Sequence, residues 1–214
     1  MLRRLLDYPR IQEESMPQQL QARLNSMSED PSDPFTGSIR ALVGPRDAVK
    51  YERPMRELIL ALPAMTARIH DWIGGTRSRS GIARLHGFAM AYLYSPDDLL
   101  PEARMGMFGY LDDAYLVARV YHRSLLEADC SGSGPLPAGA PQPGNVHDWI
   151  RIARQLLPME TAALDKMLKE VFIRRTGNYA GLLAKAAAGG RVKARRSSGT
   201  GCRSLRIKKD NYNG

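Results

Sequence analysis

The stretch SPDDLLPEARMGMFGYLDDAYLVARVYHRSLL, residues 95–126, decides the fold of this chain because it holds the densest cluster of helix-start signals. Ser95 is a favoured N-cap residue, and Pro96 suits the first helical position after it. Asp98 stands three residues after this cap, where a carboxylate can reach back to it. Pro101 disfavours helix in the residue before it, so the pattern predicts a first helix of about one turn.

A second helix start lies at Asp112 and Asp113, after an apolar connector that contains Gly106 and Gly109. Apolar residues then recur at three- and four-residue steps, as on one face of an α-helix: Leu111, Ala114, Tyr115, Ala118, Tyr121 and Leu125. A carboxylate at a helix start can accept hydrogen bonds from the unpaired N–H groups of the first turn. We therefore expect Asp112 or Asp113 to cap a long helix, and Ser95 with Asp98 to cap the short one.

A family resemblance rests on the fixed spacing of these residues: Pro96, Asp98, Leu99, Leu100, Pro101, Glu102, Gly106, Gly109, Leu111, Asp112 and Asp113. The pattern resembles the YkvA-like family, domain of unknown function 1232, whose motif reads SPxDLIPE, a connector and then GxLDD. The resemblance covers roughly residues 82–126 and implies no established activity. Asp97 and Arg104 depart from positions that are usually apolar in the family, which argues against a membrane-buried version.

Charge is concentrated at the C-terminal end of the 214-residue chain. The formal net charge is +9, and residues 191–214 hold eight basic residues and one aspartate, a net +7 that leaves +2 for the rest. We expect residues 190–214 to form a disordered basic tail. The tail could also bind nucleic acid or anionic lipid through charge, with these candidate residues: Arg191, Lys193, Arg195, Arg196, Arg203, Arg206, Lys208 and Lys209.

The two cysteines, Cys130 and Cys202, both lie in segments rich in glycine and serine. They form neither a disulfide framework nor a zinc pattern, so a reducing compartment is the default. No run of about 18 apolar residues obliges a helix to cross a bilayer. We expect a cytoplasmic location, with peripheral attachment to a membrane as an open alternative.

The chain as a whole predicts an all-α fold, because no segment shows strand alternation. We expect a helix over 49–73 with a kink at Pro63, a helix over 79–94, and a helical region over 146–175 with a break at Pro158. The predicted organisation is a compact helical core with a C-terminal helical appendage and disordered termini, divided into a flexible arm (1–36), the core (37–129), a Gly/Pro/Ser linker (130–145), a C-terminal helical region (146–189) and the tail (190–214).

The sharpest candidate for chemistry is the acidic cluster of the central stretch. If the connector folds back, Asp98, Glu102, Asp112 and Asp113 come close enough to bind Mg²⁺ or Ca²⁺, which prefer oxygen ligands. The competing interpretation makes these residues helix caps and dipole partners, and we favour it because acidic residues are the expected occupants of helix starts.

The doublet His-Asp occurs twice, at His70–Asp71 and at His147–Asp148, each followed by Trp-Ile. A metal-dependent phosphohydrolase of the HD type has such a doublet, and His86 and His122 could supply further ligands. Short motifs of this kind arise often by chance. We therefore favour packed tryptophans beside solvated His-Asp pairs.

No pattern typical of nucleophilic or nucleotide chemistry occurs, because Gly-x-Ser-x-Gly, Walker and dinucleotide-binding glycine loops are all missing from the sequence. We predict a non-enzymatic helical interaction or scaffold module with a protein partner, no catalytic residue and no cofactor. Two alternatives stay open: a metal-dependent enzyme that uses the acidic cluster, and a nucleic-acid-binding accessory protein that acts through the tail.

Overall fold

The computed structural model describes residues 16–74, 80–95, 99–130 and 139–173, and these are helical with no strand among them. The all-α prediction is confirmed. The helices are α2 (Met16–Glu29), α3 (Phe35–Val43), α4 (Pro45–Leu60), α5 (Leu62–Gly74), α6 (Ser80–Leu93), α7 (Glu102–Met105), the 3₁₀ helix η1 (Gly106–Tyr110), α8 (Leu111–Cys130), α9 (Pro143–Leu156) and α10 (Pro158–Ile173).

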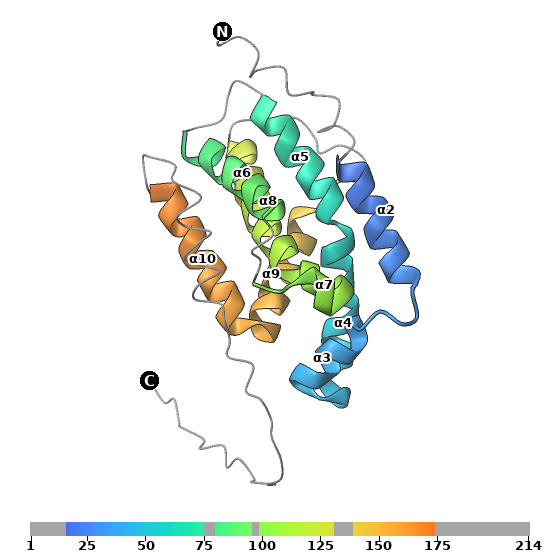
Figure 1. The fold of residues 1–214 in the computed structure, drawn as a ribbon. Helices are drawn as coiled ribbons and strands as arrows, with labels where there is room; N and C mark the ends of the chain where they lie inside the picture. The colour runs from blue at the N-terminus through green and yellow to red at the C-terminus, as the bar shows by residue number, and fades with distance from the viewer. Residues whose placement is uncertain (1–15, 75–79, 96–98, 131–138, 174–214) are drawn as a thin grey trace, which may run out of the picture.

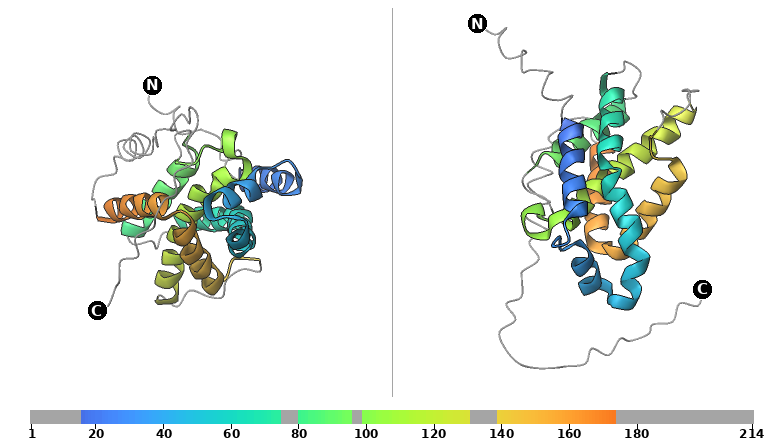
Figure 2. Two further views of the ribbon diagram at one scale, coloured as in Figure 1. Left: turned by 90° about the horizontal axis from the view of Figure 1, so that it is seen from below. Right: turned by 90° about the vertical axis from the view of Figure 1, so that its right-hand side faces the viewer.

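Helix α8 is the centre of the molecule, and α4, α5, α6, α9 and α10 all pack against it. In Figure 1 it lies between α10 on one side and α5 and α2 on the other, and the view from below in Figure 2 places α10 and α2 on the same opposite sides. Every side chain over residues 111–118 is buried. A helix that is covered on all faces is expected at the middle of a bundle.

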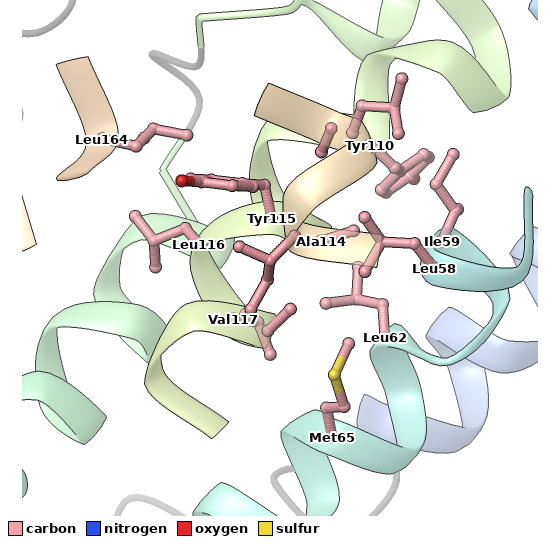
Figure 3. Packing of buried hydrophobic residues seen from close by; sticks show 14 of the residues in the cluster. Leu58, Ile59, Leu62, Met65, Tyr110, Ala114, Tyr115, Leu116, Val117 and Leu164 are labelled. Carbon is pink, nitrogen blue, oxygen red and sulfur yellow. The ribbon is translucent and has the colours of Figure 1, made fainter. Parts of the chain in front are cut away.

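The helix predicted over 49–73 is divided at Ala61 into α4 and α5. Pro63 has no N–H to donate to the carbonyl of Ile59, and its ring crowds that carbonyl, so the chain turns just before it. The predicted apolar face is confirmed, since Met55, Leu58, Ile59, Leu62, Met65 and Ile69 are fully buried. Figure 3 shows Leu58, Ile59, Leu62 and Met65 facing Ala114 and Val117 of α8.

The C-terminal helical region forms part of the main core, whereas the sequence suggested a separate appendage. The predicted break at Pro158 is present, between α9 and α10. Val146 and Ile150 of α9 and Leu164 and Val171 of α10 lie in the same apolar cluster as α4 and α8. The spacing of apolar residues in the sequence identified the apolar stripe of this region. It did not show that α4 and α8 cover that stripe.

A charged network joins the three helices of this half of the molecule. Asp165 of α10 accepts hydrogen bonds from Arg119 of α8 at 2.8 Å and from Arg154 of α9 at 2.7 Å. Arg154 also donates to the Tyr115 hydroxyl at 2.9 Å. Since these residues come from three different helices, the network fixes how α9 and α10 lie against α8.

The N-terminal arm, expected to be flexible up to residue 36, contains an ordered helix in its second half. Helix α2 packs against α4, α5 and η1, and its Leu24 is fully buried. Its apolar residues Leu20, Leu24 and Met27 recur at helical spacing but form a narrow stripe in a polar sequence. Such a stripe is stable as a helix only when tertiary packing covers it.

Candidate functional site: the aspartate pair at the start of helix α8

Asp112 and Asp113 lie in the first turn of α8, which begins at Leu111 directly after η1. Both residues are only 1% exposed. Negative charge near a helix N-terminus is favoured by the helix dipole, whereas burial of a carboxylate opposes its ionisation. The start of α8 therefore places two carboxyl groups inside the protein.

The Asp112 carboxylate holds the loop that precedes it. Its Oδ2 atom accepts hydrogen bonds from the Tyr92 hydroxyl at 2.9 Å, from the Leu99 N–H at 3.0 Å and from the Leu100 N–H at 3.2 Å. Tyr92 lies near the end of α6, so one oxygen joins α6, the loop and α8. The capping prediction for Asp112 did not include this role, because it considered only the N–H groups of the helix that the residue begins.

Burial sets the protonation of this group. It raises the pKa of Asp112 from its ordinary value of 3.8 to about 6, although the hydrogen bonds from Tyr92 and the backbone oppose that rise. Burial raises the pKa of Tyr92 well above its usual range, and the negative charges of Asp112 and Asp113 add to this effect. Tyr92 thus stays protonated and remains a hydrogen-bond donor at any ordinary pH.

Gly109 allows η1 to lie directly on the start of α7. A Cβ atom at this position would stand 2.5 Å from the Cα and 2.8 Å from the N of Glu102, closer than real Cβ contacts allow. The motif glycine is therefore required by close backbone packing. Glu102 itself forms an ion pair with Arg23 of α2 at 3.7 Å, and burial raises its pKa.

Sequence reasoning did not identify Asp33, which fixes the same region from the other side. Its Oδ1 accepts the N–H of Phe35 at the start of α3, and its Oδ2 accepts the N–H of Met107 in η1, both at 2.9 Å. Gly106 has a φ of +55°, and a Cβ there would lie 2.5 Å from Asp33 Oδ2. An Asp-Pro pair before a helix is a recognisable start signal. The local sequence, however, does not predict that Asp33 also accepts the N–H of Met107.

Among the described residues, no three His, Cys, Asp or Glu side chains are grouped as a metal ion would require. Asp98 lies outside those residues, so the set of Asp98, Glu102, Asp112 and Asp113 stays a prediction. A cavity of about 150 Å³ between α2, α5 and α6 is lined by other residues, with Thr66, His70 and Asp71 supplying its polar wall. Neither aspartate of the pair lines that cavity.

Residues 85–118 match a family model. The family is described as "Protein of unknown function (DUF1232)", and the match runs from Leu85 of α6 to Ala118 of α8. The predicted resemblance is confirmed over this DUF1232 segment, which contains Tyr92, Leu99, Leu100 and Asp112. No curated protein and no solved structure matches the chain.

Three of the histidines that the sequence singled out differ in their exposure to solvent. His70 and His147 are exposed on α5 and α9. His86 of the DUF1232 segment is buried; it stacks on Trp72 and lies 2.8 Å from the Ser124 hydroxyl, which itself donates to the Val120 carbonyl.

Two further predictions concern charge and membranes. The eight basic residues predicted to bind polyanions, at positions 191–209, lie outside the described residues, as does the helix start predicted after Ser95. The helices that the structure describes include none with the length and apolar character needed to cross a bilayer.

Proposed function

We propose that the chain is a non-enzymatic helical interaction module, in which the DUF1232 segment holds a surface turn in one shape for a protein partner. The turn comprises residues 99–105, the loop after α6 together with α7. One observation carries the proposal. Asp112 is only 1% exposed, and its Oδ2 atom accepts three hydrogen bonds from within the protein. A buried carboxylate with these partners supports a role in positioning the backbone.

The turn is constrained from three sides. Asp112 binds the N–H groups at its beginning, Gly109 of η1 lies against Glu102 in its middle, and Asp33 binds the N–H of Met107 just after its end. A surface segment that is already ordered loses little conformational entropy when it binds. Rigid presentation is thus the chemical advantage that this arrangement supplies.

The outer side of the turn is available to a partner. Pro101, Ala103 and Arg104 are exposed, while Leu100 is buried beneath them. The exposed guanidinium of Arg104 suits an acidic partner surface, since it can bind carboxylates through paired hydrogen bonds. We propose that this small, rigid turn recognises a carboxylate-bearing protein surface through Arg104.

Site-specific photo-crosslinking in the native host tests the proposal. A photoreactive amino acid at Ala103 is expected to give a defined protein adduct that Arg104→Glu removes without lowering the melting temperature. The matched control places the same group at Met159, which is 78% exposed at the start of α10. Equal adducts from both positions would contradict the proposal. Adducts to nucleic acid would favour the tail alternative, and Mg²⁺- or Ca²⁺-dependent turnover lost in Asp112→Asn would favour the enzyme alternative.

A further inference from the structure

His122 and His147 bring two imidazole rings together across the contact between α8 and α9. Their ring centroids are 5.9 Å apart, and the ring planes are tilted by 44°. His147 is exposed and His122 is half-buried, so solvent reaches the pair from the α9 side. This pair lies outside the DUF1232 segment and has no part in the proposed function.

The separation fits two rings that share one metal ion. A zinc–imidazole bond is about 2.0–2.1 Å long, so two imidazoles on one ion have centroids about 4.5 to 6.4 Å apart, depending on the angle at the metal. The observed 5.9 Å falls within that span. Neutral imidazole is a good ligand for Zn²⁺, Cu²⁺ and Ni²⁺ and a poor one for Mg²⁺ and Ca²⁺.

The charged groups around the pair are largely compensated. Arg119, one turn before His122 on α8, is held by Asp165 of α10 at 2.8 Å. Arg151, one turn after His147 on α9, pairs with Asp148 at 3.5 Å. Arg123, beside His122, lies over the Phe172 ring at 3.8 Å and pairs with Glu127 at 3.9 Å. On α5, which also packs against α8, Arg68 lies over the Trp72 ring.

These neighbours also favour the neutral form of the His122 ring. Burial lowers the pKa of His122, and the nearby His147 and Arg119 lower it further. A ring that is already deprotonated near neutral pH loses no proton when it binds a metal.

We propose that His122 and His147 form a binding site for one borderline divalent transition-metal ion, of the Zn²⁺, Ni²⁺ and Cu²⁺ class. Each ring contributes one nitrogen, and water completes the coordination. Because the ligands come from two helices, the ion binds the folded chain better than the unfolded one and stabilises the packing of α9 on α8. The site goes beyond the proposed function, which requires no metal.

The sequence offers a matched control for the exposed ligand. His70 and His147 both begin the tetrapeptide His-Asp-Trp-Ile, and both are exposed. His147→Ala removes a ligand of the proposed site, whereas His70→Ala removes an exposed histidine in the same local sequence. Since thiolates also bind these metals, the measurements are repeated in a Cys130→Ser, Cys202→Ser background.

The test uses the full, untagged chain after treatment with a chelator, titrated with ZnCl₂, NiCl₂, CuCl₂, MnCl₂ and MgCl₂ by calorimetry and by thermal melting. We expect one ion per chain, a melting temperature that rises with Zn²⁺ or Ni²⁺, and affinity that increases from Mn²⁺ through Ni²⁺ to Cu²⁺. Binding should weaken at pH 5, where protons compete for imidazole.

His147→Ala should weaken binding at least about tenfold, since even outer-shell changes have effects of that size. His122→Gln should act similarly, and His70→Ala should leave binding unchanged. The proposal is overturned if wild type shows no binding, if His147→Ala binds as tightly as wild type, if His70→Ala causes an equal loss, or if the cysteine-free background loses the site.

Discussion

Tyr92 and Asp112 form a buried hydrogen bond of 2.9 Å that closes the DUF1232 segment on itself. The same Asp112 oxygen receives two backbone N–H groups of the intervening loop. Removal of the carboxylate therefore leaves three donors unpaired, while removal of the phenol hydroxyl leaves the acceptor with two partners.

Asp112→Ala should destabilise the fold by about 3 kcal/mol, since buried donors that lose their partner cost roughly 1–3 kcal/mol each and the loop can relax in part. Tyr92→Phe should cost about 1 kcal/mol, because Asp112 keeps its two backbone bonds. Urea unfolding monitored by circular dichroism measures both changes. A smaller effect for Asp112→Ala than for Tyr92→Phe would contradict the role assigned to the carboxylate.

The pH dependence of stability should reflect two buried groups with opposite signs. Asp112 has a folded pKa of about 6, above its ordinary 3.8, so its protonation favours the folded state. Its contribution is present below pH 4 and is lost as pH rises through 6. Burial lowers the pKa of His86 from 6.5 to about 4, so its contribution is present above pH 6.5 and is lost as pH falls towards 4.

The two contributions to stability therefore oppose each other between pH 4 and 6.5. Asp112→Asn should therefore be less stable at pH 4 than at pH 7, and His86→Gln should show the reverse. Melting temperatures of both variants across this range measure the slopes. If the melting temperatures of both variants changed with pH in the same direction, one of the two pKa shifts would have the wrong sign.

Gly109→Ala should destabilise the fold by about 1–3 kcal/mol, because the new methyl group overlaps the backbone of Glu102 and neither segment can move freely. Gly37 is the matched control, since it lies inside α3 and a Cβ there would meet nothing within 4 Å. Gly37→Ala should stabilise α3 by about 0.5–1 kcal/mol through helix propensity. Thermal melting measures both changes: the melting temperature should fall in Gly109→Ala and rise in Gly37→Ala.

Asp33→Ala should cost about 2 kcal/mol, because the N–H groups of Phe35 and Met107 both lose an acceptor. Asp33→Asn keeps one oxygen and should cost about half as much. Asp30 provides the control, because its carboxylate accepts from the N–H and the hydroxyl of exposed Ser32, and its removal should leave stability nearly unchanged. Equal losses for Asp30→Ala and Asp33→Ala would refute the bridging role of Asp33.

Local signals in the sequence predicted the helices well. They did not predict the contacts between residues that are far apart in the chain. Pro63 and Pro158 mark real breaks, and the apolar periodicity from Met55 to Ile69 identifies a real buried face. The Asp33–Met107 bond joins residues 74 positions apart, and no local preference of either residue encodes it.

The same limit applies to the candidate site. The spacing placed Asp112 at a helix start, which is where it lies, but a carboxylate at that position can accept from its own helix or from any donor folded against it. Only packing decides between these partners, and the docking of α2, α9 and α10 was hidden for the same reason.

The hydrogen bond from Tyr92 to Asp112 closes a loop of only 20 residues. Chain entropy lost on loop closure grows slowly with length, and short loops form within microseconds, so this ring can form early when the chain collapses. The hydrogen bond from Arg84 to Phe172 joins residues 88 positions apart, so its formation closes a longer loop and loses more chain entropy. We expect the ring to be structured in the folding transition state, with α10 docking afterwards, so that the DUF1232 segment acts as the folding nucleus of the whole chain.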